Sequence, residues 1–337
     1  MMKRTITLLF IMTFILSAKD YTKNPITIEF MDTLVQTYDF KRADLEKLFS
    51  DVKVQKSALR VYLFKEKNKS TPEEIAALKK RYPKYGAWDR YAKYRISEAR
   101  VQQGVDFIKR YQKIFDQVEK KYTVPKEYIA AIIGIETMYG RNVGKYPVFD
   151  TLSTLAFEKN RRNTFFQKEL MKFLHLSQTE KFNPKNVYGS YAGAIGLGQF
   201  MPSNYEAYGV DFNEDGRITL QKPEDAIASI ANYLKENGWR KGEPVATRVG
   251  YQGMRFKAYE TGYRKTYDRA QLKGIRPKKK WDYWGKVRLI KLNKEKYDEL
   301  WYGAKNFFVI TRYNHSAYYA MSVHQLATKI AAKMKEE

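Results

Sequence analysis

One carboxylic acid on an otherwise apolar helix face is the residue of this chain best suited to acid–base chemistry. Glu136 falls three and four residues after Ile133 and Ile132, so it occupies the apolar stripe of its own predicted helix. No basic residue stands three or four positions away from it. Burial raises the pKa of such a carboxyl group, as a general acid working near neutral pH requires. The alternative is a structural glutamate that caps loop amides or pairs with Arg141 or Arg161.

A run of small residues offers a second candidate feature. Residues 188–198 contain four Gly and two Ala, and Gln199 and Phe200 follow them. Small residues let a ligand or another backbone approach closely, and a Gln beside a Phe offers an amide next to a stacking ring. The spacing does not match the Gly-rich phosphate-binding motifs. Tight helix packing through Gly and Ala is the competing explanation.

An acidic loop begins at Asp211 and matches the first eight positions of a calcium-binding loop. Asp211, Asn213 and Asp215 alternate to aim oxygens inward, and Gly follows them for the sharp turn. Position twelve is Lys222, where a bidentate Glu is expected, and Asp225 is the nearest substitute. The sequence therefore predicts bound Ca²⁺, against the alternative of a solvated acidic turn stabilised by Asx hydrogen bonds.

The elements that must position these residues are mostly helical. Periodic apolar residues predict a long helix over 97–122, another from Pro125 to a cap at Gly140, and further helices at 151–159, 163–175, 223–237 and 317–334. Helical spacing also occurs over 26–62, and a helix start is expected at residues 71–74. After residue 239 the texture changes, and Val287–Leu292 and Phe307–Tyr313 are predicted as strands.

Composition narrows the function classes. The 337 residues include 62 Lys or Arg and 37 Asp or Glu, a net charge of +25, and no Cys. The missing Cys excludes disulfides, thiolate zinc sites, cysteine nucleophiles and a lipid-modified N-terminal cysteine. A charge this large favours anionic polymers or membrane surfaces as partners, but no nucleic-acid motif is present.

The first residues have the pattern of a secretory signal. Two basic residues precede fourteen uncharged ones that end at Ala18, a stretch shorter than the roughly 20 apolar residues of a membrane-spanning helix. We expect residues 1–18 to be a signal peptide that directs export to the periplasm. An uncleaved signal anchor is the alternative.

Several separated motifs, taken in order, carry a family resemblance. They are I-G-I-E-T-M-Y-G at 133–140, G-S-Y-A-G-A-x-G-x-G-Q-F-M-P-S at 189–203, V-D-F-N-E-D-G-R-I at 210–218, A-N-Y-L at 231–234 and R-Y-N-H-S-A-Y-Y-A at 312–320. Over roughly residues 100–335 the chain resembles the membrane-bound lytic transglycosylase B family, glycoside hydrolase family 103. The best-known members are lipoproteins, and a chain without Cys departs from that pattern, which favours a soluble periplasmic enzyme.

The resemblance implies a mainly α fold of the α+β class, with a goose-lysozyme-like helical core, a flanking helical domain and a small antiparallel β domain. It divides the chain into an N-terminal helical domain at 19–115, a catalytic core with the calcium loop at 116–244, a β-rich domain at 245–312 and a C-terminal active-site segment at 313–337.

The resemblance also implies roles for individual residues. Glu136 matches the catalytic acid/base. Positions that match the lining of the sugar-binding groove are Ser190, Gln199, Phe200, Tyr233, Tyr313, Asn314 and Tyr319, and Arg161 and Arg162 match a basic pair near the glycan. Those that match the calcium loop are Asp211, Asn213, Asp215, Arg217 through its carbonyl, and Asp225. The ion would be structural, and no cofactor is implied for catalysis.

The implied function is a lytic transglycosylase that cleaves the β-1,4 bond between N-acetylmuramic acid and N-acetylglucosamine and leaves 1,6-anhydromuramic acid ends. The alternatives are a hydrolytic muramidase on the same fold, which a second carboxylate in the groove would favour, and a non-catalytic peptidoglycan-binding protein. The expected partners are glycan strands and proteins of cell-wall synthesis or division. We expect neither nucleic-acid binding nor a lipid anchor, and we expect the protein to be a monomer.

Overall fold

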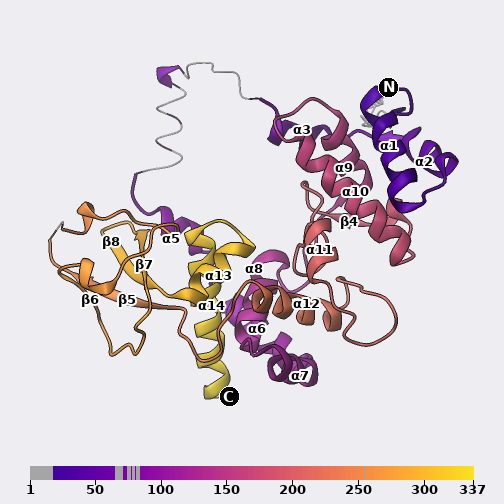
Figure 1. Ribbon diagram of the computed structural model, residues 1–337. Helices are drawn as coiled ribbons and strands as arrows, with labels where there is room; N and C mark the ends of the chain where they lie inside the picture. Colours follow the sequence, from indigo (N-terminus) through magenta and orange to yellow (C-terminus); the bar gives the residue numbers. More distant parts are fainter. Residues whose placement is uncertain (1–17, 65–70, 74–76, 78–79, 81–83, 254) are drawn as a thin grey trace, which may run out of the picture.

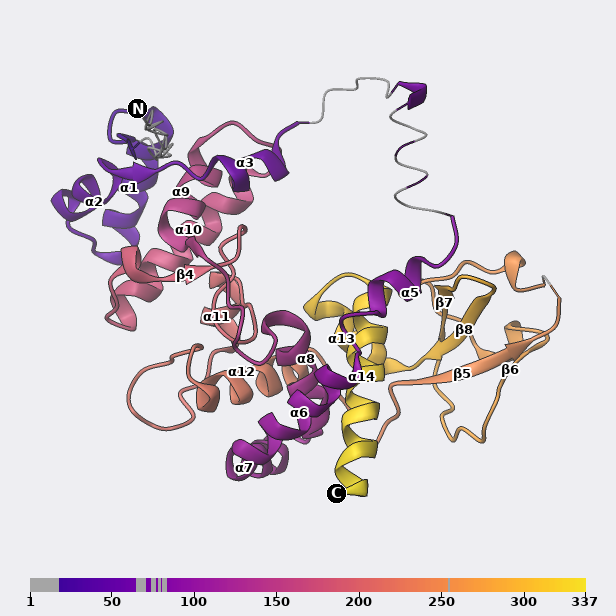
Figure 2. The same ribbon diagram turned by 180° about the vertical axis from the view of Figure 1, so that it is seen from behind.

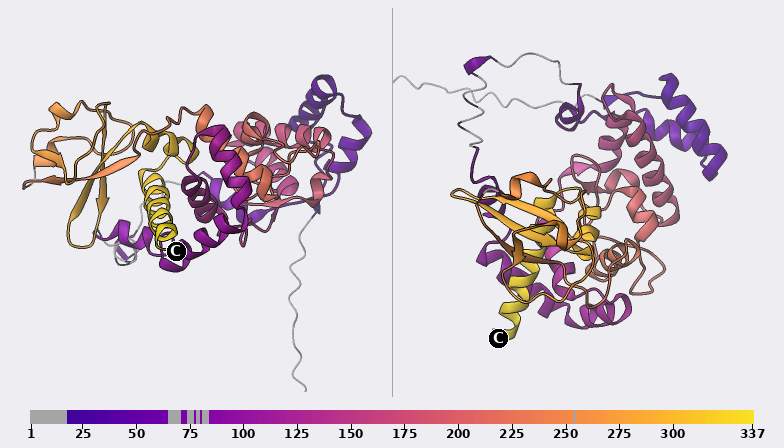
Figure 3. Two further views of the ribbon diagram at one scale, coloured as in Figure 1. Left: turned by 90° about the horizontal axis from the view of Figure 1, so that it is seen from below. Right: turned by 60° about the vertical axis from the view of Figure 1, so that its left-hand side comes forward.

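The computed structural model describes residues 18–64, 71–73, 77, 80, 84–253 and 255–337. The molecule is elongated and has three parts (Figures 1 and 3). A central helical body lies in the middle, with a helical group that includes the N-terminal helices at one end and a small β-sheet domain at the other. The predicted signal segment at 1–18 lies almost wholly outside the described residues. Of the helix start predicted at 71–74, residues 72 and 73 are helical and residue 74 lies outside the described residues. Among the described residues, no helix is both long and apolar enough to cross a membrane.

The helical group at one end joins the first helices to a later pair. Its members are α1 (Pro25–Tyr38), α2 (Arg42–Phe49), α3 (Lys56–Tyr62), α9 (Val148–Phe157) and α10 (Asn163–Thr179), with the short strands β1 (Ala18–Lys19) and β2 (Val52–Lys53). Apolar residues of the first helices, such as Phe30 and Phe49, share one buried cluster with Phe157 and Phe166. This core therefore draws on residues from both sides of the boundary predicted at residue 115.

The central body holds the other α-helices whose bounds the structure describes. They are α5 (Ala87–Ala92), α6 (Glu98–Arg110), α7 (Gln112–Tyr122), α8 (Lys126–Thr137), α11 (Pro202–Tyr208), α12 (Pro223–Glu236), α13 (Lys305–Tyr313) and α14 (Ala317–Glu336). The C-terminal α14 runs beside α8 and α6 (Figure 2). The single helix predicted over 97–122 is wrong in one respect, because the chain leaves helical geometry at Tyr111 (φ −112°, ψ 28°) and divides it into α6 and α7.

The β domain is a four-stranded antiparallel sheet. Its strands are β5 (Ala246–Tyr251), β6 (Ile275–Pro277), β7 (Arg288–Asn293) and β8 (Asp298–Gly303), in the order β6-β5-β8-β7. Val249 of β5 pairs with Leu300 of β8, and both are buried in the core of this domain.

The strand predicted at Phe307–Tyr313 is wrong, because this segment is helix α13. Its Phe, Val, Ile and Thr residues favour strands locally, but Phe307 and Ile310 are fully buried at a spacing of three residues in the central core. Tertiary packing therefore overrides the local preference.

Candidate active site

The candidate acid, Glu136, lies in the last turn of α8. The helix is held by Ile129, Ile132 and Ile133, all fully buried. It ends at Thr137 rather than at the predicted Gly140 cap, because Met138 already adopts a left-handed backbone (φ 55°). Glu136 itself is only partly buried and lines a cleft. The helix therefore presents one carboxyl group where the apolar core meets this cleft.

This cleft has a volume of about 600 Å³. It lies between the segment that follows α8 and the Gly-rich segment. Its lining consists of Glu136, Arg141, Asn142, Val143, Gly144, Lys145, Tyr146, Ser190, Tyr191 and Gln199. Glu136 is the single acidic residue among these described lining residues, whereas Arg141 and Lys145 are cationic. The predicted groove residues Ser190 and Gln199 are thus placed together with the predicted acid.

The electrostatic surroundings of Glu136 suit a proton donor. Burial raises the pKa of its carboxyl group to about 7. Two weaker effects oppose this shift: a 2.7 Å hydrogen bond donated by the Tyr319 hydroxyl to Glu136 Oε1, and the positive charge of Arg95. The carboxyl group can therefore gain and lose a proton near neutral pH.

The Gly-rich segment builds the opposite wall through close backbone contacts. Strands β3 (Tyr146–Pro147) and β4 (Tyr188–Gly189) pair here, and a Cβ atom added to Gly144 would lie 2.0 Å from the Gly189 carbonyl oxygen. The Ser190 hydroxyl oxygen accepts hydrogen bonds from the N–H groups of Ala192 and Ala194. Tight packing and cleft formation, which appeared as alternatives in the sequence, therefore coincide.

Gln199 acts within the same wall. Its side-chain amide donates hydrogen bonds of 3.0 Å to the carbonyls of Val143 and Gly196. Its backbone has a positive φ of 52°, which is uncommon for a residue with a side chain. Gln199 thereby ties the segment after α8 to the Gly-rich segment and fixes the width of the cleft.

Two of the predicted aromatic residues occupy a different place from that expected. Phe200 is 2% exposed and Tyr233 is 6% exposed, so neither offers a ring face to a sugar. Both pack around Tyr313, with ring centroids 5.7 Å and 4.9 Å away, and the Tyr313 hydroxyl donates to the Gly198 carbonyl. The resemblance matches Phe200 and Tyr233 to the lining of the sugar-binding groove, but neither is among the residues that line this cleft, and the folded chain uses both rings as buried support.

Tyr319 is also buried, and its role is polar rather than stacking. Its ring lies nearly parallel to that of Tyr313 at 6.3 Å, and its hydroxyl reaches Glu136. Asn314, at the turn between α13 and α14, is exposed, and within the described residues its side chain makes no hydrogen bond to Glu136. Asn314, which the resemblance matches to the groove lining, is not among the residues that line the cleft around Glu136.

The basic pair lies beyond the Tyr191 side of the cleft. Tyr191 lines the cleft, and its ring is 6.3 Å from that of Tyr62. The Arg161 N–H group donates to the Tyr62 carbonyl, and the Arg162 guanidinium stacks on Phe165 at 3.9 Å. Both arginines are exposed, so their charges can reach a ligand that extends past Tyr191.

Sequence reasoning missed the residues of the segment directly after α8, above all Arg141 and Lys145, and also Tyr191 and Arg95. One signal could have found the first two, because a loop that leaves a helix at the end carrying the candidate acid must pass close to that acid. The proximity of Arg95 and Tyr191 follows only from tertiary packing.

The acidic loop folds around its own backbone. Asp211 accepts hydrogen bonds from the N–H groups of Asp215 and Gly216, and Asp215 Oδ1 accepts from Arg217. These bonds hold Asp211, Asn213 and Asp215 in one turn, which fits an oxygen-ligated hard cation in the kind of donor it offers. The Lys222 ammonium group lies 2.6 Å from Asp215 Oδ2, so a positive charge of the protein itself partly neutralises this acidic loop.

Asp225 is held by the backbone of the acidic loop. It is fully buried, and its two oxygens accept hydrogen bonds from Phe212 and Thr219 at 2.9 and 2.7 Å. Within the described parts of the chain, no three His, Asp or Glu side chains converge as metal ligands would. Asp211 and Asp215 are engaged by loop amides in the same way, so the role of Asp225 as a calcium ligand stays a prediction.

Known proteins resemble this chain over nearly its whole length. The family model described as the transglycosylase SLT domain matches residues 23–328. The chain is 39% identical over 314 residues to membrane-bound lytic murein transglycosylase B of Escherichia coli K12. This alignment covers 93% of this chain and 84% of that protein.

Solved structures agree with these matches. The Escherichia coli lytic transglycosylase SLT35 in complex with bulgecin A has a TM-score of 0.84 and 38% identity, over 94% of this chain and 96% of that one. The same enzyme in complex with calcium has a TM-score of 0.83, 38% identity and the same coverage. Soluble lytic transglycosylase SltB1 from Pseudomonas aeruginosa has a TM-score of 0.79 and 37% identity, over 92% of this chain and all of that one. These similarities confirm the mainly α, lysozyme-like fold class.

Proposed function

This chain belongs to the transglycosylase SLT domain family, and from that membership we propose that it is a peptidoglycan lytic transglycosylase with Glu136 as its single acid/base. It cleaves the β-1,4 bond between N-acetylmuramic acid and N-acetylglucosamine and leaves 1,6-anhydromuramic acid ends. One observation carries the mechanism: Glu136, with a pKa raised to about 7, is the sole carboxyl group among the described residues that line the cleft.

The lone carboxyl group bears on the choice between transglycosylase and hydrolase. Most glycosidases place a second carboxylate in the site, either as nucleophile or as the base that activates water. The lining residues described in this cleft supply no such second group. The chemistry therefore draws its other reacting groups from the substrate, which favours the transglycosylase over a hydrolytic muramidase.

In the first step, neutral Glu136 donates its proton to the glycosidic oxygen. The bond between C1 of the muramoyl residue and that oxygen breaks, and N-acetylglucosamine leaves with a new 4-hydroxyl group. The muramoyl 2-acetamido group stabilises the oxocarbenium-like centre at C1 as a neighbouring nucleophile. Glu136 is left as a carboxylate, which the Tyr319 hydrogen bond and the charge of Arg95 stabilise.

In the second step, the Glu136 carboxylate takes the proton of the muramoyl 6-hydroxyl group. The 6-oxygen attacks C1 and closes the 1,6-anhydro ring, and the acetamido group is released. Glu136 returns to its protonated form, and no water is consumed. A carboxyl group with a pKa near 7 can serve as both acid and base within one turnover.

The remaining residues position the strand. The Ser190 hydroxyl oxygen accepts in both of its described hydrogen bonds, which leaves its O–H group free to donate to a sugar. Tyr191 and Tyr313, each partly exposed, offer sugar-facing surface, whereas Gln199 keeps the cleft open. Arg161 and Arg162 hold anionic groups of the strand beyond Tyr191.

We also propose that this protein is exported to the periplasm and that its binding partner there is the peptidoglycan strand. The related Pseudomonas aeruginosa SltB3, 26% identical, has been solved with an N-acetylglucosamine–N-acetylmuramic acid pentapeptide, and the Escherichia coli relative is named a membrane-bound murein enzyme. The net charge of +25 supports attraction to the carboxylates of stem peptides.

The acidic loop is proposed to bind Ca²⁺ through Asp211, Asn213, Asp215, the Arg217 carbonyl and Asp225, whose carboxylate also holds the loop backbone. The Escherichia coli SLT35 structure in complex with calcium supports this proposal. Such an ion would stabilise the fold by binding only the native state, and it takes no part in the reaction.

Mass spectrometry of the products tests the function. Residues 19–337 and a Glu136→Gln variant are incubated with purified sacculi, and Glu119→Gln serves as control because Glu119 is also a partly buried carboxyl group with a raised pKa. We expect anhydro products from the wild type and the control, and a loss of at least about 100-fold in the Glu136 variant. Reducing muramic acid products would identify a hydrolase, and full activity of Glu136→Gln would overturn the assignment of the acid.

A further inference from the structure

The β domain carries a concentration of positive charge that the catalytic cleft does not explain. Residues 245–304 contain 16 Lys or Arg and 6 Asp or Glu, a net charge of +10 within the +25 of the whole chain. Much of this charge surrounds a concave pocket of about 800 Å³ beside β6. Its cationic lining residues are Arg269, Lys273, Arg276, Lys278, Lys279 and Lys280.

Most of these charges have no internal partner. Within the described residues, Lys273, Arg276, Lys278 and Lys279 form no ion pair, and Lys280 has only an exposed one with Asp282 at 3.7 Å. Their positive charges gather around one pocket without neutralisation among the described residues, so they attract an external anion. The pocket is therefore complementary to a negatively charged ligand.

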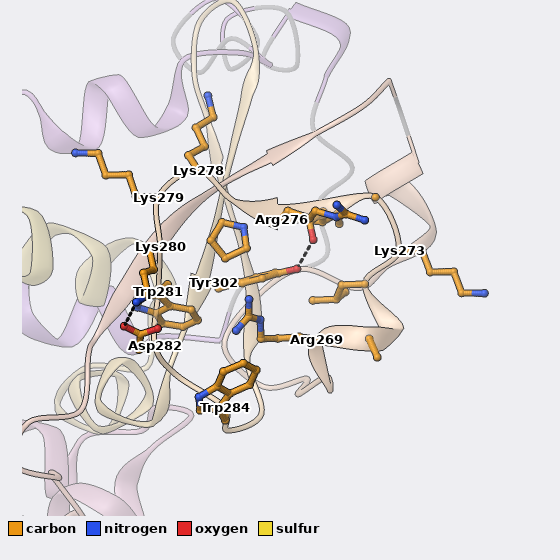
Figure 4. Close-up of a pocket in the computed structure, with 15 residues that line it drawn as sticks. Arg269, Lys273, Arg276, Lys278, Lys279, Lys280, Trp281, Asp282, Trp284 and Tyr302 are labelled. Atoms are coloured by element: carbon orange, nitrogen blue, oxygen red, sulfur yellow. Dashed lines mark hydrogen bonds and ion pairs between the residues drawn. The ribbon is translucent and has the colours of Figure 1, made fainter.

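Aromatic rings give the pocket a second kind of surface. Figure 4 shows Trp281 and Trp284 among the basic side chains, whereas Tyr302, which also lines the pocket, is 1% exposed and offers no ring face to a ligand. The Arg269 guanidinium lies 5.9 Å and 5.8 Å from the ring centroids of Trp281 and Trp284. Trp284 is 89% exposed, which is unusual for the largest apolar side chain. An exposed indole beside cations suits a ligand that joins a sugar or peptide to anionic groups.

The pocket is separate from the catalytic cleft. β6 forms the edge of the sheet that is turned away from α8, which carries Glu136 (Figures 1 and 2). None of the residues that line the basic pocket lines the cleft. A ligand can therefore occupy both sites only if it is an extended polymer or if two molecules bind.

We propose that this pocket is a second binding site for peptidoglycan, which holds carboxylate-bearing stem peptides of a strand outside the catalytic cleft. The inference rests on the proposed function, since it assumes the same polymer as substrate. A concave site matches a projecting peptide better than the flat surface of a bilayer. Two weak sites on one insoluble polymer strengthen each other, because the first contact raises the effective concentration for the second.

Sedimentation with purified sacculi tests this site. The Glu136→Gln protein, which leaves the strands intact, is compared with the same protein carrying Lys273→Gln, Lys278→Gln and Lys279→Gln. We expect the triple substitution to weaken sacculus binding roughly tenfold, from three exposed ion pairs, with the difference lost at about 0.5 M salt. The three lysines are exposed, so their replacement leaves the fold intact.

A matched control removes the same charge elsewhere. Lys113→Gln, Lys120→Gln and Lys235→Gln neutralise three exposed lysines of α7 and α12 that form no ion pair within the described residues. Their effect on binding should be less than about twofold, because they lie outside the pocket. An equal loss in both triple variants would overturn a specific site and indicate a general effect of net charge.

Further arms identify the ligand. Sacculi whose carboxylates have been amidated should bind the proteins with and without the pocket substitutions equally. The proposal fails if those sacculi still discriminate between the two proteins. It fails equally if binding to anionic phospholipid vesicles or to inorganic phosphate is lost while sacculus binding is unchanged.

The two proposals can fail separately. With Glu136 intact, the pocket variant should cleave a short soluble glycan at the wild-type rate. If the wild-type chain released no anhydro products, the proposed function would fail, whereas the difference in sacculus binding would still be measured.

Discussion

The hydroxyl group of Tyr319 donates a 2.7 Å hydrogen bond to Oε1 of Glu136, although 183 residues separate them in the chain. The bond joins the start of α14 to the end of α8 and fixes the orientation of the candidate acid. It also favours the ionised carboxylate and so opposes the effect of burial on the pKa of Glu136.

Replacing Tyr319 by Phe should therefore raise the pKa of Glu136 further. The alkaline limb of kcat/KM is expected to move to higher pH, and the maximal rate should fall roughly tenfold, because the carboxyl group loses a charge-assisted hydrogen bond. A pH profile of sacculus digestion measures both effects. A lower rate with an unmoved limb would show that Tyr319 acts through packing alone.

The pH dependence of the wild type follows from the same carboxyl group. The first step requires protonated Glu136, whose pKa burial raises to about 7. We expect kcat/KM to fall as pH rises through that value, by about tenfold per pH unit well above it. A rate that is constant from about pH 6 to 9 on a soluble glycan would contradict a general acid with this pKa.

The raised pKa of Glu136 also affects stability. Its ordinary value is 4.5 and its folded-state value is about 7, so the unfolded chain loses this proton at lower pH than the folded chain. Relative to Glu136→Gln, the wild type therefore loses free energy of unfolding as pH rises from about 4.5 to 7, by roughly 3 kcal/mol in total.

Urea unfolding at pH 4 and pH 8 measures this difference. Glu136→Gln should be more stable than the wild type at pH 8 by roughly 3 kcal/mol more than at pH 4. A gap between the two proteins that does not change with pH would show that burial of Glu136 is not the cause of the shift.

Gly144→Ala should damage the cleft. An added Cβ atom would lie 2.0 Å from the Gly189 carbonyl oxygen, and the backbone of Gly144 has a positive φ of 99°. We expect a loss of about 2 kcal/mol or more in the free energy of unfolding, with reduced activity.

Gly242→Ala is the control, because its backbone has a φ of 74° with no atom within 4 Å of the added carbon. It should cost about 1 kcal/mol, from backbone strain alone. Equal losses of unfolding free energy in the two variants would exclude the close approach of the two cleft segments as the reason for Gly144.

Calcium should stabilise the protein without being required for chemistry. At about 100 times its Kd, Ca²⁺ is expected to add roughly 2.7 kcal/mol to the free energy of unfolding. Thermal melts with Ca²⁺ or with a chelator measure this, and activity at low temperature should survive chelation.

Lys222→Gln sharpens this test. The Lys222 ammonium group lies 2.6 Å from Asp215, so its removal should strengthen Ca²⁺ binding, whereas Asp211→Asn should weaken it. A melting temperature that does not respond to Ca²⁺ in any of the three proteins would leave a solvated acidic turn as the explanation.

Much of the fold could be predicted from the sequence because the governing interactions are local. The spacing of apolar residues predicted helices that the structure places at α8, α9, α10, α12 and α14, and the alternation in 287–292 predicted β7. The same periodicity placed Glu136 on an apolar face, which is the physical reason for its raised pKa. Residue order alone was therefore enough to single out the candidate acid.

Tertiary structure decided what depends on residues distant in sequence. The Phe307–Tyr313 segment became a helix because burial in the central core outweighs its strand preference. Phe200 and Tyr233 became support because other aromatic rings cover them. Asp225 turned toward the loop amides of Phe212 and Thr219.

Tertiary structure also decided the hydrogen bond from Tyr319 to Glu136 and the basic pocket of the β domain. Each brings together groups from separate parts of the chain, and a sequence pattern of short period carries no information about which distant residues will meet. The sequence by itself predicted most of the helices and singled out the candidate acid. Long-range packing determined the hydrogen-bond partner that holds this acid and the surfaces on which a ligand can lie.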